Sequence, residues 1–124
     1  MTDVMITPAQ LADRFLKLDG ALEDATARLK FLEQDYPVVK DAYIAAMASA
    51  RIKIRAKRIE GGVKYTIAEV EDEATMESRD TASRLSATEG LMRATRMDVE
   101  KVQTQVSMAQ TLAKLLLAQI QGGL

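Results

Sequence analysis

Apolar residues recur along most of this chain at alternating steps of three and four, the repeat of a helix that packs against other helices. The first seam, as we name it, consists of Leu11, Phe15, Leu18, Leu22, Ala25, Leu29, Leu32, Tyr36, Val39, Tyr43, Ala46 or Met47, Ala50 and Ile54. The second seam consists of Ile67, Val70, Ala74, Ser78, Ala82, Leu85, Thr88, Met92, Thr95, Val99, Val102, Val106, Ala109, Ala113, Leu116 and Ile120. The pattern predicts two long helices.

The first helix has a clear start signal. Thr7, Pro8 and Gln10 fit a capping box, in which the threonine caps the helix and the glutamine reaches back to it. Pro37 removes one backbone donor inside the helix, yet the first seam keeps its phase beyond this residue. We therefore expect one helix over residues 7–58 with a kink near Pro37. A break at Pro37, which would give three helices, is the alternative.

A second break lies at Gly61-Gly62, since adjacent glycines can end a helix in the left-handed conformation. Thr66 then caps a new helix and Glu69 completes a second capping box. We expect a turn over residues 59–65 and a helix over residues 66–121, ended by the glycines at 122 and 123. Residues 51–55 and 63–67 also alternate with period two, so a β-hairpin over residues 51–67 is the alternative.

These elements predict an all-α fold in which residues 1–124 form a single extended helical domain. The short connection predicts a long, coiled-coil-like antiparallel hairpin. Two helices alone bury little apolar area, and the many Ala, Ser and Thr residues of the second seam add little to it. The stripes over residues 11–32 and 99–120 are therefore expected to meet further helices, in a dimer or tetramer of hairpins.

The amino-acid composition excludes several classes of functional site. The 124 residues include 17 basic and 18 acidic residues and lack Cys, His and Trp altogether. This excludes a disulfide scaffold, a Cys/His zinc site and histidine-dependent catalysis, so we expect a non-enzymatic protein without cofactor or metal. Apolar runs are too short to span a bilayer, and the N-terminus lacks a signal-peptide pattern. We therefore expect a cytoplasmic location and no membrane partner.

The near-zero net charge conceals a local asymmetry. Residues 51–65 hold six basic residues and one acidic residue, while residues 66–80 hold six acidic residues and one basic residue. One interpretation is a nucleic-acid site at the tip of the hairpin, because cations can follow a phosphate backbone and an aromatic ring can stack on a base. Its candidate residues are Arg51, Lys53, Arg55, Lys57, Arg58, Lys64 and Tyr65. The other interpretation is that the two blocks face and neutralise each other, which fixes the register of the hairpin.

The chain resembles small helical accessory proteins encoded near the replication and recombination genes of tailed bacteriophages and prophages. The resemblance rests on residues 42–46 (AYIAA), 51–57 (RIKIRAK) and 60–66 (EGGVKYT), and on the long helices that flank them. It implies a phage-type accessory role in the bacterial host cell. Together with the basic tip, it leads us to expect binding of single-stranded DNA or of a DNA-processing protein. The alternative is a structural or inhibitory module that binds proteins through its helical flanks.

Overall fold

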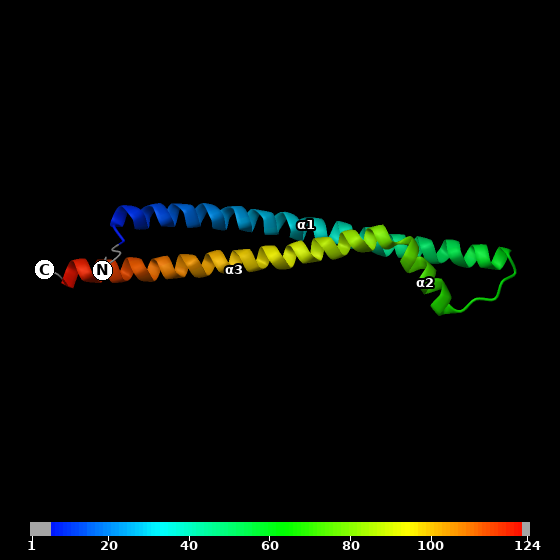
Figure 1. The fold of residues 1–124 in the computed structure, drawn as a ribbon. Coiled ribbons are helices and arrows are strands. Elements are labelled where there is room, and N and C mark those ends of the chain that lie inside the picture. The colour runs from blue at the N-terminus through cyan, green and yellow to red at the C-terminus, as the bar shows by residue number, and fades with distance from the viewer. Residues whose placement is uncertain (1–5, 123–124) are drawn as a thin grey trace. The chain divides into compact units, whose positions relative to one another are not determined.

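The computed structural model describes residues 6–122, and nearly all of them are helical (Figure 1). The elements are α1 (Pro8–Glu60), α2 (Ile67–Glu77) and α3 (Arg79–Gly122), and residues 6–122 contain no strand. The all-α prediction is confirmed. The β-hairpin alternative over residues 51–67 is wrong, because residues 51–60 belong to α1.

The start of α1 has the predicted capping box. The Gln10 N–H donates to Thr7 Oγ1 at 3.1 Å, and the Thr7 N–H donates to Gln10 Oε1 at 3.0 Å. Both bonds satisfy backbone donors that have no partner within the helix. α1 then passes through Pro37 without interruption, so the alternative of a chain break at this residue is wrong. The kink at Pro37 stays a prediction.

The glycine turn after α1 is a Schellman motif. The Val63 N–H donates to the Arg58 carbonyl at 3.0 Å, and the Gly62 N–H donates to the Ile59 carbonyl at 3.1 Å. Gly62 has φ +66°, in the left-handed region where a Cβ is unfavourable. The predicted role of the glycine pair is confirmed. The helix ends two residues later than predicted, at Glu60.

The second predicted helix is divided, which corrects the expectation of one helix over residues 66–121. α2 ends at Glu77 and α3 begins at Arg79, with Ser78 between them at φ −93° and ψ 12°. This ψ lies far from the helical value near −42°. The i→i−4 backbone bonds continue across this point, because the Ser78 N–H donates to the Ala74 carbonyl at 3.0 Å and the Ala82 N–H donates to the Ser78 carbonyl at 2.9 Å. The Thr81 hydroxyl also donates to the Ser78 carbonyl at 2.8 Å.

The structure divides into two compact units, which we describe separately. One consists of the described residues up to Lys30 together with those from Ala94 onwards, and the other consists of residues 31–93. Every member of the first seam is buried or half-buried, which confirms the predicted periodicity. The second seam is likewise confirmed except at its ends, where Ile67 and Ile120 are exposed.

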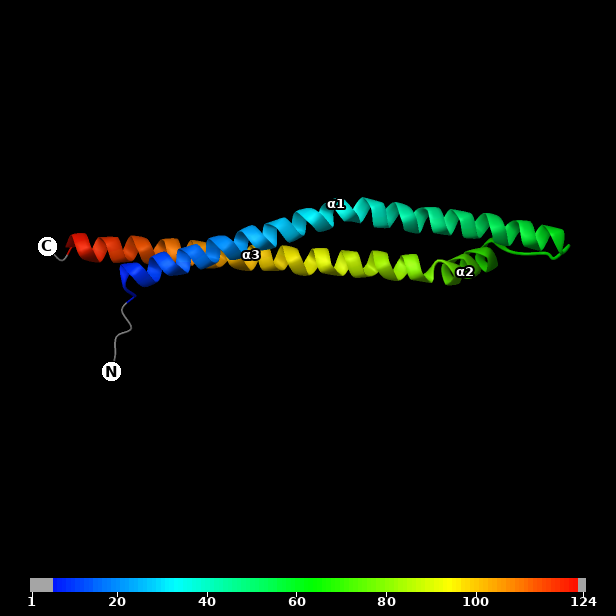
Figure 2. The same cartoon turned by 90° about the horizontal axis from the view of Figure 1, so that it is seen from above.

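The core of the unit of residues 31–93 joins α1 to α2. Met47, Ala50 and Ile54 of α1 pack with Val70 and Ala74 of α2. Figure 1 and Figure 2 both show α2 beside the last turns of α1. Small residues on both sides let the two helices approach closely. In the other unit, α1 and α3 lie side by side, since Leu18 and Met108 line one groove. Within residues 6–122, no helix combines the length and apolarity that crossing a membrane requires.

Candidate functional site

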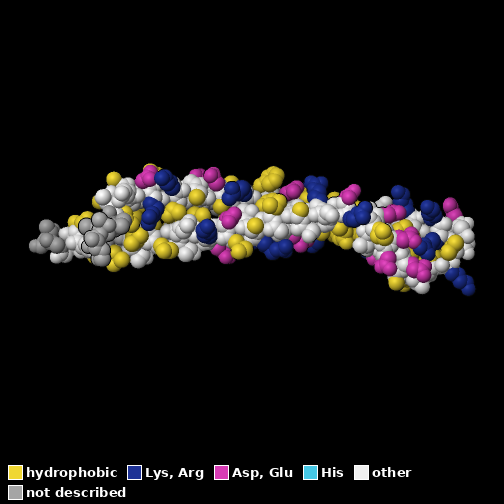
Figure 3. Space-filling model, viewed as in Figure 1, with side chains coloured by type: hydrophobic (Ala, Val, Ile, Leu, Met, Phe, Trp, Pro, Cys, Tyr) yellow, Lys and Arg dark blue, Asp and Glu magenta, His cyan; other side chains and the backbone are white. Residues whose placement is uncertain are grey.

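The tip, which we define as residues 51–73, carries all seven predicted nucleic-acid residues at the end of α1 and in the segment before α2, together with the first acidic residues of α2. Figure 3 shows basic and acidic side chains interspersed over this region. Arg51 makes a bidentate ion pair with Glu71: Nε lies 2.6 Å from Oε1, and Nη2 lies 3.1 Å from Oε2. Both side chains are part-buried. The planar guanidinium matches a carboxylate in this geometry, so Arg51 is held in one orientation.

Arg58 also forms ion pairs with α2. Its Nη1 donates to Glu69 Oε2 at 2.9 Å, and its Nη2 donates to Glu73 Oε1. Glu69 has a second role, because its N–H donates to the Thr66 hydroxyl at 3.2 Å and so caps α2. The carboxylate that a full capping box would direct to the Thr66 N–H instead accepts from Arg58. The same residue thus caps α2 and joins it to α1.

The ion pairs shift the pKa values of three groups, Glu71, Arg51 and Arg58. The hydrogen bond from Arg51 holds the pKa of the Glu71 carboxyl below its ordinary value, and the positive charges of Arg51 and Arg55 act in the same direction. Partial desolvation of the carboxylate works against this effect. The hydrogen bonds that Arg51 donates to Glu71 and Arg58 donates to Glu73 raise the pKa values of the two arginines. All of these groups stay charged at neutral pH.

The other four cations of the tip are placed differently. Lys53, Arg55, Lys57 and Lys64 are exposed, and within residues 6–122 none of them forms an ion pair. Tyr65, in the segment before α2, is 37% exposed. The predicted site is therefore split: two arginines pair with the acidic block, and three lysines and one arginine face solvent. The interpretation that the two charge blocks pair holds for Arg51 and Arg58, and the nucleic-acid interpretation stays a prediction.

A second kind of surface lies in the unit built from the start of α1 and the end of α3. A groove of about 290 Å³ is lined by Arg14 and Leu18 of α1 and by Gln105, Met108, Ala109 and Leu112 of α3. Another, of about 330 Å³, is lined by Phe15, Leu16, Asp19, Leu22, Val106 and Gln110. Their walls are mostly apolar. Both grooves therefore expose apolar surface of α1 and α3.

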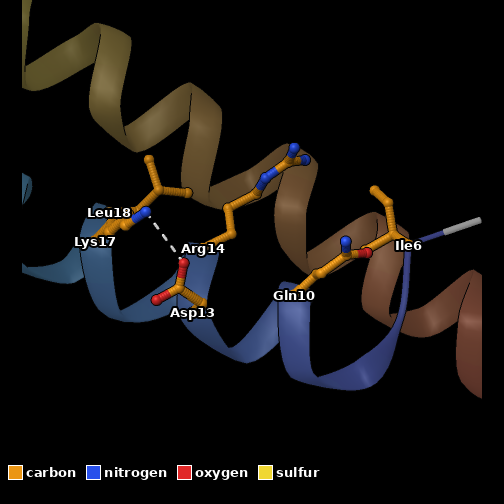
Figure 4. Close-up of a pocket in the computed structure, with 6 residues that line it drawn as sticks. All are labelled: Ile6, Gln10, Asp13, Arg14, Lys17 and Leu18. Carbon is orange, nitrogen blue, oxygen red and sulfur yellow. Dashed lines mark ion pairs between the residues drawn. The ribbon is translucent and has the colours of Figure 1, made fainter. Parts of the chain in front are cut away.

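The start of α1 forms one wall of a third groove, of about 510 Å³ (Figure 4). The lining residues are Ile6, Gln10, Asp13, Arg14, Lys17 and Leu18. Lys17 Nζ lies 3.1 Å from Asp13 Oδ2, so two of the charges in this groove neutralise each other. Arg14 and Leu18 also line the 290 Å³ groove, which makes the two hollows neighbours.

One feature escaped the sequence analysis. Phe31, Val38, Ile52 and Ile59 of α1 are exposed although they are large and apolar. Their spacing is a multiple of seven throughout. The first seam runs along the same stretch of helix with the same repeat and contains the buried residues, so it concealed this second row. A search for a second heptad row would have found it.

The described residues contain no group of three or more His, Cys, Asp or Glu side chains placed to hold a metal ion. Comparisons of the chain with protein-family models, curated proteins and solved structures found no match. The function is therefore inferred from the ion pairs of the tip and the exposed surfaces of the helices.

Proposed function

We propose that this chain is a non-enzymatic helical interaction module that acts through the exposed flanks of its helices. The observation that carries the proposal is the exposure of large apolar side chains on regular helices. In the unit that contains the end of α3, these residues are Leu16, Met108, Leu112, Leu115, Leu117 and Ile120. Apolar faces of this kind gain free energy when another helix covers them.

The proposal includes an antiparallel hairpin as the scaffold, with α1 as one arm and α2 and α3 as the other. Its support comes from each unit separately. In residues 31–93, the connection between Glu60 of α1 and Ile67 of α2 is short, and α2 returns beside the end of α1, where Arg51 pairs with Glu71 and Arg58 pairs with both Glu69 and Glu73. In the other unit, α1 and α3 line two grooves together, and their residue numbers increase in opposite directions (Figure 1). The ion pairs at the tip fix the register of the two arms.

Light scattering on the purified protein, coupled to size-exclusion chromatography, tests the module. We expect a mass of two or four chains. The double variant Leu112→Glu/Leu115→Glu places charges on an exposed apolar face of α3 and should lower the mass or the affinity of association. Thr104→Glu/Ser107→Glu adds the same charge to exposed polar positions of this helix and should leave the assembly intact. A wild-type monomer at every concentration would contradict the proposal.

A second candidate function rests on the four solvent-facing cations of the tip. Lys53, Arg55, Lys57 and Lys64 could follow a phosphate backbone, with Tyr65 stacking on a base. The resemblance to phage accessory proteins agrees with single-stranded DNA, or a DNA-processing protein, as the partner. The acidic side chains of α2 beside this surface oppose phosphate binding, which is why we place it second.

Fluorescence anisotropy with a labelled single-stranded oligonucleotide at low salt tests the DNA function. Lys53→Glu/Lys57→Glu should weaken binding at least tenfold, and added salt should weaken the wild type steeply because counterions are released on binding. Lys101→Glu/Lys114→Glu changes the net charge equally on α3 and should bind like the wild type. Failure of the wild type to bind at low salt would overturn this function and leave the interaction module untouched.

A further inference from the structure

A second heptad pattern runs along the exposed side of α1 within the unit of residues 31–93. We name it the outer stripe. It consists of two interleaved rows in which residues follow one another seven apart. One row is Phe31, Val38, Ala45, Ile52 and Ile59, and the other is Asp35, Ala42, Ser49 and Ala56. The steps between the rows alternate between four and three, which is the arrangement of positions a and d in a coiled coil.

The outer stripe faces solvent at every member except Asp35, which is half-buried. Phe31, Ile52 and Ile59 are each 67% exposed and Val38 is 62% exposed, while the alanines of both rows and Ser49 are exposed as well. The first seam occupies a different face of the same turns, where Val39 is 1% exposed. This stretch of α1 therefore has two faces with an apolar heptad row, of which only one is packed in the folded chain.

The heptad repeat of the outer stripe indicates that its partner is a helix. The outer stripe extends over four heptads, the length at which an a/d repeat indicates a coiled coil. A pocket for a small ligand would not need this periodicity, whereas a second helix would match it along about 42 Å of axis. The small residues at the centre, Ala42, Ala45 and Ser49, permit close approach of two backbones, and the larger side chains flank them.

We propose that the partner is a second copy of the chain, lying antiparallel on the outer stripe with the two-fold axis at Ala45. The inference rests on the proposed interaction function and specifies its surface. In the row that contains Ala45, side-chain size is symmetric about this residue: Phe31 and Ile59 lie fourteen positions away on either side, and Val38 and Ile52 lie seven positions away. Antiparallel pairing thus sets large side chains opposite large ones and Ala45 opposite its own copy. This row is therefore self-complementary, as a two-fold interface requires, while the second row faces residues 55, 48, 41 and 34 of the second copy.

Charge selects the antiparallel orientation. Residues 31–42 hold three acidic residues and one basic residue, whereas residues 48–59 hold five basic residues and no acidic one. Antiparallel pairing about Ala45 brings these segments together and places Asp35 opposite Arg55 of the second copy. Arg55 is among the cations without an ion pair within residues 6–122. Parallel pairing would instead set Asp35 against Asp35 at a core position, where two carboxylates repel each other.

Sedimentation equilibrium tests the surface. Ala45→Glu sets two like charges against each other on the axis, and Ile52→Glu places a charge at two symmetric points of the interface. Each should weaken self-association at least tenfold. Ile44→Glu is the matched control, because Ile44 lies on the same helix and is 52% exposed but lies outside both rows. It should associate like the wild type. Circular dichroism of each variant checks that the helices remain folded.

Cysteine cross-linking tests whether the two copies are antiparallel. The chain has no native cysteine, so the cross-linker reacts only at the introduced ones. Phe31→Cys and Ile59→Cys chains are mixed and treated with a short bismaleimide. Antiparallel pairing predicts a mixed dimer joining the two variants and little cross-linking of either variant alone. Cross-linking of each variant to itself, without the mixed product, would mean a parallel pair and would overturn the proposal.

The outcomes distinguish failure of the proposed interaction module from failure of the outer stripe as its surface. A wild-type chain that stays monomeric would overturn both the interaction module and the outer stripe. A wild-type oligomer whose mass is unchanged by Ala45→Glu and Ile52→Glu would overturn the outer stripe alone. Loss of association in Ile44→Glu as well would show a general effect of charge on α1, and it would also count against the specific surface.

Discussion

The turn after α1 depends on the backbone of a single residue, Gly62. Its φ of +66° places any Cβ in an unfavourable position. We expect Gly62→Ala to lower the free energy of unfolding by about 1 kcal/mol, measured by urea denaturation at fixed protein concentration. Gly20→Ala is the control with the opposite sign. An added Cβ at Gly20, inside α1, meets no atom within 4 Å, so this variant should gain about 0.5–1 kcal/mol. Equal effects of the two substitutions would contradict this account of the turn.

The ion pair between Arg51 and Glu71 makes stability depend on pH. The pKa of the Glu71 carboxyl is lower in the folded chain than in the unfolded one, so the pair stabilises the fold above the ordinary pKa of 4.5. That contribution is lost as the pH falls through the lowered, folded-state pKa. Thermal unfolding should show the wild type more stable than Glu71→Gln at about pH 6, with the difference shrinking towards about pH 3.

Arg51→Gln provides the control for this pH effect. In an Arg51→Gln background the further change Glu71→Gln should alter stability little at either pH, because the bidentate partner is already absent. A difference between wild type and Glu71→Gln that is the same at both pH values would mean that the carboxylate contributes no pairing energy.

At the scale of the element, the junction between α2 and α3 contains an unsatisfied group. The Ser78 side chain is buried, and within the described residues its hydroxyl oxygen has no hydrogen-bond partner. A buried polar atom without a partner costs free energy, so Ser78→Ala should raise the free energy of unfolding by about 1 kcal/mol. Ser86→Ala, at an exposed position of α3, should change it by about 0.5 kcal/mol at most. Destabilisation by Ser78→Ala would show that the hydroxyl is needed at this junction.

The pairing of α1 with α2 depends on Arg58 as well as on apolar contacts. Glu69→Lys/Glu73→Lys would turn both of its ion pairs into repulsions and should lower the thermal midpoint of unfolding. Asp72→Lys/Glu77→Lys has the same formal charge change on the same helix without removing an ion pair of Arg58, so it should lower the midpoint less. Equal losses would mean that the acidic block acts only through its total charge.

At the scale of the whole molecule, the exposed apolar faces raise the question of assembly. The flanks near Leu112 and Leu115 and the outer stripe centred on Ala45 lie in different units and are separate surfaces. If both bind copies of the chain, one surface gives dimers and the two together give larger assemblies. Masses measured for Ile52→Glu and for Leu112→Glu/Leu115→Glu should then differ from each other and from the wild type.

The sequence by itself determined the helical character of the chain, the caps at Thr7 and Thr66, the glycine turn and the buried seams, but not the division of the second helix at Ser78. Each of these follows from local rules: the Thr7 cap needs only Gln10 three residues away, and the buried positions need only the three-four repeat. The sequence could also locate the basic tip, because charge counts do not depend on folding.

Only the tertiary structure decided which charges pair. Arg51 and Arg58 meet α2, while Lys53 and Lys57 do not, because a partner's distance depends on helix rotation and on register. The interruption at Ser78, where ψ is 12°, is likewise absent from the seam pattern, which keeps its three-four repeat through this residue. The outer stripe was visible in the sequence as a repeat, but its exposure was not. Two heptad faces on one helix look alike until the fold covers one of them and leaves the other to solvent.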